Sequence, residues 1–108
     1  MLWSALKLPS PDEPLPSTDA VRQALAVWAL QFTPRVAIAE EAVLLEVGGS
    51  LRLFGGRLAL RERLWPGAQE LGATALAWAP NALAALALAG AGVEDGLGEP
   101  LAALLDPL

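Results

Sequence analysis

The sequence predicts an α+β domain in which a four-stranded antiparallel sheet carries two helices on one face and is followed by a C-terminal helix. The chain of 108 residues is 55% hydrophobic, which is enough for one buried core. Segments of strand character alternate with segments whose apolar residues recur at helical spacing. Their order is strand, helix, strand, strand, helix, strand, helix. The first six follow the split βαβ pattern of ferredoxin-like folds.

The first strand and helix are predicted on either side of a proline-rich linker. Residues 2–8 form the strand candidate, and residues 9–16 contain four prolines, which favours an extended linker. Ser17, Thr18 and Asp19 can cap a helix that continues to about Phe32. The following Thr33-Pro34 ends that helix, because a residue before proline disfavours helical geometry.

A hairpin and a second helix are predicted next. Residues 35–39 and 42–47 are rich in Val, Ile and Leu and flank a Glu40-Glu41 turn. The glycine-rich residues 48–56 predict a loop with apolar side chains packed inward, since they match neither a P-loop nor a dinucleotide-binding loop. The second helix begins near Arg57, is kinked or restarted at Pro66-Gly67, and ends by residues 71–72.

The last strand and helix are rich in alanine. In residues 74–79, Thr74, Leu76 and Trp78 alternate with alanines, so one face is large and the other is small enough for close helix packing. A third helix is predicted over residues 81–89 with Pro80 in its first turn. It is apolar nearly all round and needs cover on more than one side. One or two helical turns are predicted at residues 101–105.

Composition excludes several kinds of chemistry. The chain has no Cys and no His, which removes thiol and Ser/His/Asp catalysis and the commonest zinc ligands. Its formal net charge of −5 is unfavourable for an autonomous nucleic-acid-binding protein. The first eight residues lack the pattern of a signal peptide, and the uncharged residues 71–93 are interrupted by Pro80-Asn81. We therefore expect a cytoplasmic protein without membrane contact.

The charged and aromatic residues give three further candidates, each with an alternative. Glu40, Glu41 and Glu46 would hold Mg²⁺ if they converged, but exposed or edge carboxylates are the favoured interpretation. Arg52, Arg57 and Arg61 are candidates for phosphate or DNA contact, against a solvated helix face. The four tryptophans favour core packing or an interface over base stacking, because basic residues do not interleave with them.

Three runs of residues resemble a known family. They are WALQFTPRVA at residues 28–37, LLEVGGS at residues 44–50 and LRLFGG at residues 51–56. Together they resemble the palm region of Y-family DNA polymerases, and more narrowly the ImuB-type branch of bacterial mutagenic DNA repair. The similarity covers roughly residues 2–90, and the family palm has the strand and helix order predicted above. The resemblance implies a palm-like domain at residues 1–90 and a tail at residues 91–108, where the family's thumb domain would begin.

The resemblance also implies where catalytic groups would lie. Active members hold two Mg²⁺ ions with an Asp of the first strand and an Asp-Glu pair before the third. The first-strand position falls on Ala5, with Lys7 where a second acidic residue often lies, and the pair falls on Glu41 and Ala42.

The triphosphate-binding lysines of active members are replaced as well. Their positions fall on Ala82 and Leu86, while the neighbouring Asn81 is retained. A short proline-rich linker also stands where the family has its fingers segment.

These departures predict a chain without polymerase activity, metal or cofactor. We expect a non-catalytic palm domain that serves as a scaffold or adaptor in translesion synthesis or DNA repair. Its partners would be proteins of a repair or SOS mutagenesis complex or a second copy of itself, with weak or indirect DNA contact. The alternative is a ferredoxin-like module that binds a small regulatory ligand, which requires a polar pocket at a sheet edge or dimer interface.

Overall fold

The fold was determined from a computed structural model that describes residues 1–9 and 18–94. The predicted α+β class with a four-stranded antiparallel sheet is confirmed. In chain order the elements are β1 (Trp3–Lys7), α1 (Thr18–Ala29), β2 (Val36–Ile38), β3 (Ala42–Glu46), the 3₁₀-helix η1 (Gly48–Ser50), α2 (Leu51–Phe54), α3 (Arg57–Leu71), β4 (Ala75–Ala79) and α4 (Ala82–Ala91).

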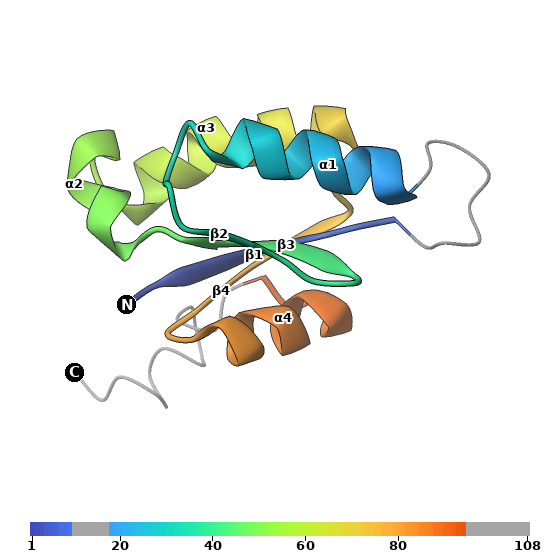
Figure 1. Ribbon diagram of the computed structural model, residues 1–108. Helices are drawn as coiled ribbons and strands as arrows, with labels where there is room; N and C mark the ends of the chain where they lie inside the picture. Colours follow the sequence, from blue (N-terminus) through green and yellow to red (C-terminus); the bar gives the residue numbers. More distant parts are fainter. Residues whose placement is uncertain (10–17, 95–108) are drawn as a thin grey trace.

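The sheet lies between two helical layers. Its strands are ordered β2-β3-β1-β4, and every neighbouring pair is antiparallel. Figure 1 shows α1 and α3 on one face of the sheet and α4 on the other. The two central strands are therefore covered on both sides, which explains why β3 is buried along its whole length.

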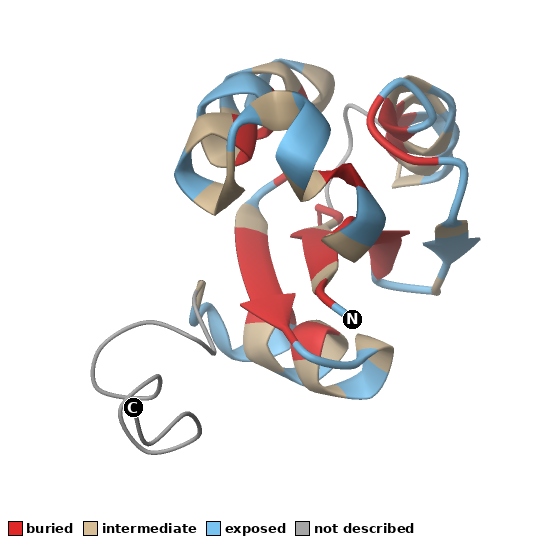
Figure 2. Ribbon diagram, turned by 90° about the vertical axis from the view of Figure 1, so that its left-hand side faces the viewer, coloured by how far each residue is buried: buried red, intermediate tan, exposed pale blue. Residues whose placement is uncertain are grey.

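Side-chain alternation divides the interior into two clusters. On the α1/α3 face, Leu6, Leu45 and Trp78 belong to the larger cluster, and Trp78 is fully buried. On the α4 face, Ala5 and Ala77 belong to a cluster of small side chains completed by alanines of α4. The buried residues accordingly run through the middle of the molecule in Figure 2. The predicted large and small faces of β4 are confirmed.

Helices α1 and α3 approach each other closely at a glycine. A Cβ added at Gly67 would lie 2.5 Å from Cζ2 of Trp28, so only glycine fits there without displacing the indole. Trp28 is also held edge-on against Phe32, with ring centroids 5.0 Å apart. The expected restart at Pro66-Gly67 was wrong: α3 continues through Pro66, which lies inside it.

Two predicted segments differ from the structure, one at the end of α1 and one in the glycine-rich residues 48–56. Helix α1 ends at Ala29, and the amides of residues 30–32 donate to the carbonyls three residues earlier. The expected loop at residues 48–56 instead contains η1 and α2. Leu51 and Phe54, three residues apart on α2, pack against the larger cluster, whereas Leu53 faces outward with 83% of its surface exposed.

Helix α4 begins one residue later than predicted. Asn81 is its N-cap, because its side-chain oxygen accepts a hydrogen bond of 2.8 Å from the Ala84 amide. Pro80 therefore precedes the cap and is not in the first turn. The expected cover on more than one side is also absent among the described residues: the sheet covers one side of α4, while Leu83 on its outer side is 80% exposed.

Some predictions lie outside the described residues. They are the extended conformation of the linker at residues 9–16, of which the structure describes only Pro9, and the helical turns at residues 101–105. Within residues 1–9 and 18–94, no helix combines the length and the hydropathy needed to span a lipid bilayer.

The Gly67 contact can be tested by adding one methyl group. We expect Gly67→Ala to lower the free energy of unfolding by about 1–3 kcal/mol, because the new Cβ displaces the Trp28 ring. Gly90→Ala in α4 is the matched control, since nothing lies within 4 Å of the added Cβ. That control is expected to leave stability unchanged or raise it by up to about 1 kcal/mol. Urea unfolding measures both, and equal effects would contradict the close approach.

Candidate functional site

The positions that the polymerase resemblance assigns to metal binding lie together in the structure. Lys7 at the end of β1 is the register partner of Ala42 at the start of β3. Ala5 lies two residues before Lys7 and points to the same face of the sheet. Glu41 immediately precedes Ala42 at the hairpin turn. Four positions that are far apart in the sequence are thus neighbours at one end of two paired strands.

Two of these four positions hold apolar side chains, and both are inside the protein. Ala5 and Ala42 are fully buried, and Ala5 packs in the small-residue cluster with Leu44 and the alanines of β4 and α4. Ala82 and Leu86, which stand at the triphosphate positions, pack against the same cluster from α4. Buried carboxylates or lysines would need partners that an alanine-rich contact does not provide.

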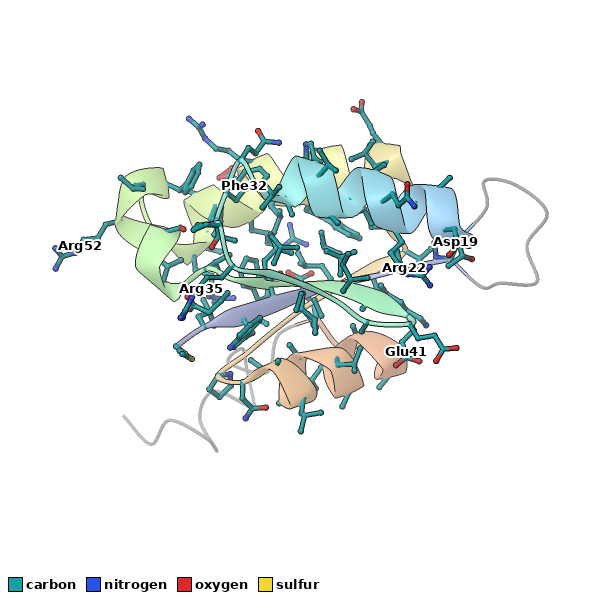
Figure 3. The ribbon with its side chains drawn as sticks, viewed as in Figure 1. Asp19, Arg22, Phe32, Arg35, Glu41 and Arg52 are labelled. Atoms are coloured by element: carbon teal, nitrogen blue, oxygen red, sulfur yellow. The ribbon has the colours of Figure 1, made fainter. Side chains whose placement is uncertain are left out.

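The acidic residues of the hairpin are on the surface. Glu40 and Glu41 are both exposed, and Figure 3 shows Glu41 projecting from the hairpin turn. Arg22 pairs with Asp19 and donates a hydrogen bond of 2.6 Å to the Glu40 carbonyl, which fixes the turn against α1. Within the described residues, no three acidic or other metal-binding side chains are grouped closely enough to hold an ion.

Glu46 lies at the opposite end of β3 from Glu40 and Glu41. The expectation of an exposed or edge carboxylate was wrong for this residue, which is 7% exposed. Its Oε2 accepts hydrogen bonds from the amides of Gly48 at 2.8 Å and Leu2 at 3.4 Å. Its Oε1 lies 3.9 Å from Nη1 of Arg35. The carboxylate therefore joins the start of the chain, the end of β3 and the following turn.

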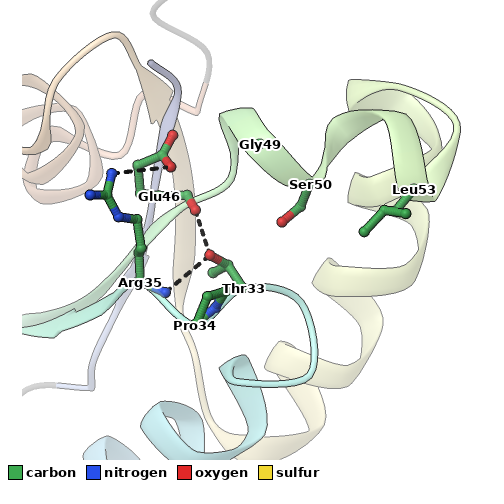
Figure 4. Close-up of a pocket in the computed structure, with 7 residues that line it drawn as sticks. All are labelled: Thr33, Pro34, Arg35, Glu46, Gly49, Ser50 and Leu53. Atoms are coloured by element: carbon green, nitrogen blue, oxygen red, sulfur yellow. Dashed lines mark hydrogen bonds and ion pairs between the residues drawn. The ribbon is translucent and has the colours of Figure 1, made fainter.

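A hollow of about 320 Å³ opens beside this carboxylate (Figure 4). Thr33 forms part of its floor, donating from Oγ1 to the Glu46 carbonyl at 2.7 Å and accepting from the Arg35 amide at 3.1 Å. In Figure 4 the side chains of Ser50 and Leu53 face Thr33 across this space. The lining residues are Thr33, Pro34, Arg35, Glu46, Gly49, Ser50 and Leu53.

The three arginines considered for phosphate contact do not converge. Arg52 projects from α2 into solvent in Figure 3, whereas Arg57 and Arg61 lie on α3. Arg61 forms a two-point ion pair with Glu94, in which Nη2 donates to Oε1 at 2.7 Å. The charge of Arg61 is therefore matched by a carboxylate of the same chain.

The Arg61 pair perturbs the titration of Glu94. The hydrogen bonds from Arg61 lower the pKa of Glu94 below its usual value of 4.5, partial burial opposes the shift, and Arg57 adds a smaller electrostatic contribution. The nearby Trp78 indole also lowers this pKa, although its Nε1 lies outside hydrogen-bond geometry with any described residue. The Trp78 amide donates to the Glu94 carbonyl at 2.7 Å, so the segment after α4 covers the outer edge of β4.

Sequence reasoning considered Glu46 only as a metal ligand or an exposed carboxylate, and it did not single out Glu94. The roles of Glu46 and Glu94 depend on tertiary contacts with residues 44 and 33 positions away, respectively. A signal was present for Glu46, because a carboxylate at the end of a buried strand and before two glycines is placed to accept amides of the following turn. The sequence around Glu94 carries no comparable signal.

Removing the Glu46 carboxylate tests its structural role. We expect Glu46→Ala to lower the free energy of unfolding by about 1–3 kcal/mol, because the Leu2 and Gly48 amides lose their acceptor. Glu46→Gln keeps one acceptor oxygen, and its loss is expected to be smaller. Urea denaturation compares the two variants. An unchanged free energy of unfolding in Glu46→Ala would show that the two amides do not depend on this carboxylate.

The Arg61–Glu94 pair predicts a pH-dependent contribution to stability. Because folding lowers the pKa of Glu94, its pair with Arg61 stabilises the fold fully above about pH 4.5, the usual pKa of the carboxyl. This contribution is lost as the pH falls through the lowered pKa of the folded state. Both side chains are about one-third exposed, so we expect at most about 1 kcal/mol. Glu94→Gln should therefore be less stable than the parent at pH 7, and the difference should shrink as the pH falls below 4.5.

A double-mutant cycle with Arg61→Gln isolates the interaction between the two side chains. Thermal unfolding across the pH range provides the measurement. A stability difference between the parent and Glu94→Gln that grows as the pH falls would contradict the prediction.

Comparison with known proteins assigns no family to this chain. No protein-family model, no curated protein and no solved structure matches it.

Proposed function

We propose that this chain is a non-catalytic Y-family DNA polymerase-like palm domain that acts as a scaffold or adaptor in translesion synthesis or DNA repair. One observation carries the proposal. The positions that the resemblance assigns to metal and triphosphate binding lie on β1, at or just before the start of β3, and on α4, and four of the six hold apolar side chains: Ala5, Ala42, Ala82 and Leu86. A palm domain that had lost its metal and triphosphate ligands would have this composition.

The remaining charges do not favour two-metal chemistry. Glu41 is the one carboxylate at the four metal positions, and it is exposed at the turn. Lys7 adds a positive charge beside it in the register, which opposes a divalent cation. Two Mg²⁺ ions need several converging carboxylates to offset their charge and replace their water ligands. The proposal is therefore a binding role and not an enzymatic one.

Protein partners or a second copy fit the surface better than DNA does. The net charge of −5 opposes phosphate binding, and Arg61 is paired with Glu94. Exposed apolar residues occur at Val27 on α1, at Leu30 in the turn that follows it, and at Leu83 on α4. DNA contact through Arg52, Arg57 and Arg61 would be weak or indirect, and the proposed location is the cytoplasm, where a repair complex assembles on DNA.

The alternative is a ferredoxin-like module that binds a small regulatory ligand, which needs a polar pocket at the sheet. The hollow beside Glu46 adjoins the paired ends of β2 and β3, but most of its exposed lining is apolar. Thermal-shift measurements against nucleotides and amino acids separate the two candidates, because stabilisation by a free small molecule supports the regulatory module.

Genetic complementation and primer extension together test the scaffold role. In the organism that carries the gene, deletion should lower damage-induced mutagenesis, and an allele with Glu41→Ala should restore it to the parental level. The purified chain should not extend a primed template with Mg²⁺ and nucleotides. Templated extension that is abolished by Glu41→Ala would refute the non-catalytic assignment, and normal mutagenesis in the deletion strain would refute the repair role.

A further inference from the structure

The outer edge of β2 presents backbone groups that the sheet does not use. Just after β2, the Ala39 amide donates to the Ala42 carbonyl at 2.8 Å, so the backbone groups of Ala39 face β3. Backbone groups alternate between the two sides of a strand in an antiparallel ladder. Those of Ala37 therefore also face β3, whereas those of Val36 and Ile38 face outward. Each of these two residues offers one N–H donor and one C=O acceptor at the edge.

The other edge of the sheet is already covered. At β4 the Trp78 amide donates to the Glu94 carbonyl at 2.7 Å. At β2, in contrast, Ala37 is exposed and Ile38 has 59% of its surface exposed. Within residues 1–9 and 18–94, no backbone group bonds to the outward groups of Val36 or Ile38. The β2 edge is therefore open to an extended strand of another chain.

The sequence of β2 is complementary to itself in an antiparallel arrangement. When Ala37 of one copy lies opposite Ala37 of a second copy, Val36 of each copy lies opposite Ile38 of the other. The outward groups of each such pair then exchange both N–H···O bonds. The central pair is not hydrogen-bonded, and such pairs have the closest side chains in the ladder, which suits the small alanine. A two-fold axis through the central pair makes the two halves of the contact identical.

The charges at the two ends of β2 favour the same arrangement. Arg35 precedes β2 and Glu41 follows it, and both are exposed at opposite ends of the hairpin in Figure 3. By alternation both belong to the sheet face on which Ala39 packs against the small-residue cluster. The two-fold pairing places Arg35 of each copy diagonally opposite Glu41 of the other, with Cβ atoms about 7–8 Å apart, which long side chains can span.

Both charged side chains have capacity for this contact. Arg35 is 63% exposed, and its closest carboxylate oxygen is Oε1 of Glu46, 3.9 Å from Nη1. Glu41 forms no ion pair with any residue that the structure describes. An ion pair between copies would therefore leave the ion pairs within each copy in place.

We propose that the outer edge of β2 binds the same edge of a second copy of this chain, in an antiparallel pair centred on Ala37. A contact between identical surfaces requires a surface that is complementary to itself. This edge meets the requirement in its hydrogen-bonding groups, its side-chain sizes and its end charges. The inference gives a surface to the second copy that the proposed adaptor function includes, and it rests on that function only for its biological setting.

Sedimentation equilibrium of the full chain over a range of concentrations tests the proposal. Because β2 is short and each copy has a net charge of −5, we expect a weak dimer with a dissociation constant on the order of 0.1 mM. Ile38→Pro should abolish the dimer, since proline removes an outward donor that the monomer does not use. Ile38→Thr is the matched control, because it keeps the amide, and its dissociation constant should stay within about threefold of the parental value.

Charge-reversed variants test the geometry of the pair. Glu41→Arg places a like charge opposite Arg35, and Arg35→Glu places a like charge opposite Glu41, so each variant alone should dimerise at least about threefold more weakly. An equimolar mixture of the two variants should form a heterodimer with about the parental dissociation constant, because opposite charges then meet at both ends. The amide spectrum of each variant reports whether it is folded.

Three results would overturn the proposal. They are a monomer at all concentrations up to about 1 mM, a dimer that Ile38→Pro leaves intact, and a mixture that associates no better than the separate charge variants. The measurements use neither DNA nor a mutagenesis assay, so a monomeric chain leaves the adaptor function to be judged by complementation.

Discussion

Contact between small side chains allows the sheet to be buried on both faces. The alanines of β1, β4 and α4 permit the helix to lie directly against the strands, while the opposite face carries Trp78 and the leucines of the larger cluster. The same alternation that builds two cores also determines what the α4 face offers chemically. Because α4 fills it with methyl groups, this face has little room for ions or phosphates.

At the end of β3, unlike on the α4 face, a buried carboxylate holds the backbone in place. Glu46 accepts amides from Leu2 and Gly48, and a Cβ at Gly48 would lie 2.8 Å from Oε2, so the glycine allows the backbone to approach the carboxylate. This arrangement holds the turn into η1 and α2 in place. It thereby places Ser50 and Leu53 opposite Thr33 and leaves the hollow between them.

Local pattern was sufficient to predict most of the helices and strands, but not η1, α2 or the contacts between distant residues. The strict alternation from Thr74 to Ala79 predicted two differently sized faces, and both are present. Helix ends were less predictable: α1 stops at Ala29 because tertiary packing of Phe32 favours a tighter turn. The partners of Glu46 and Glu94 depend on approach between distant segments, which no local window contains. Ala5, Lys7, Glu41 and Ala42, which the polymerase resemblance singled out, are neighbours because β1 pairs with β3 in this fold.

The two borders of the sheet differ in their capacity to recruit other chains. At β4 the Trp78 amide is already bonded to the Glu94 carbonyl, whereas β2 pairs on one side with β3 and ends after three residues, at Ile38. An unpaired edge strand can bind a strand of another chain. A very short edge strand limits this, because it has few free backbone N–H and C=O groups. Lengthening β2 would therefore carry a risk of aggregation that the native hairpin avoids by turning at Glu40.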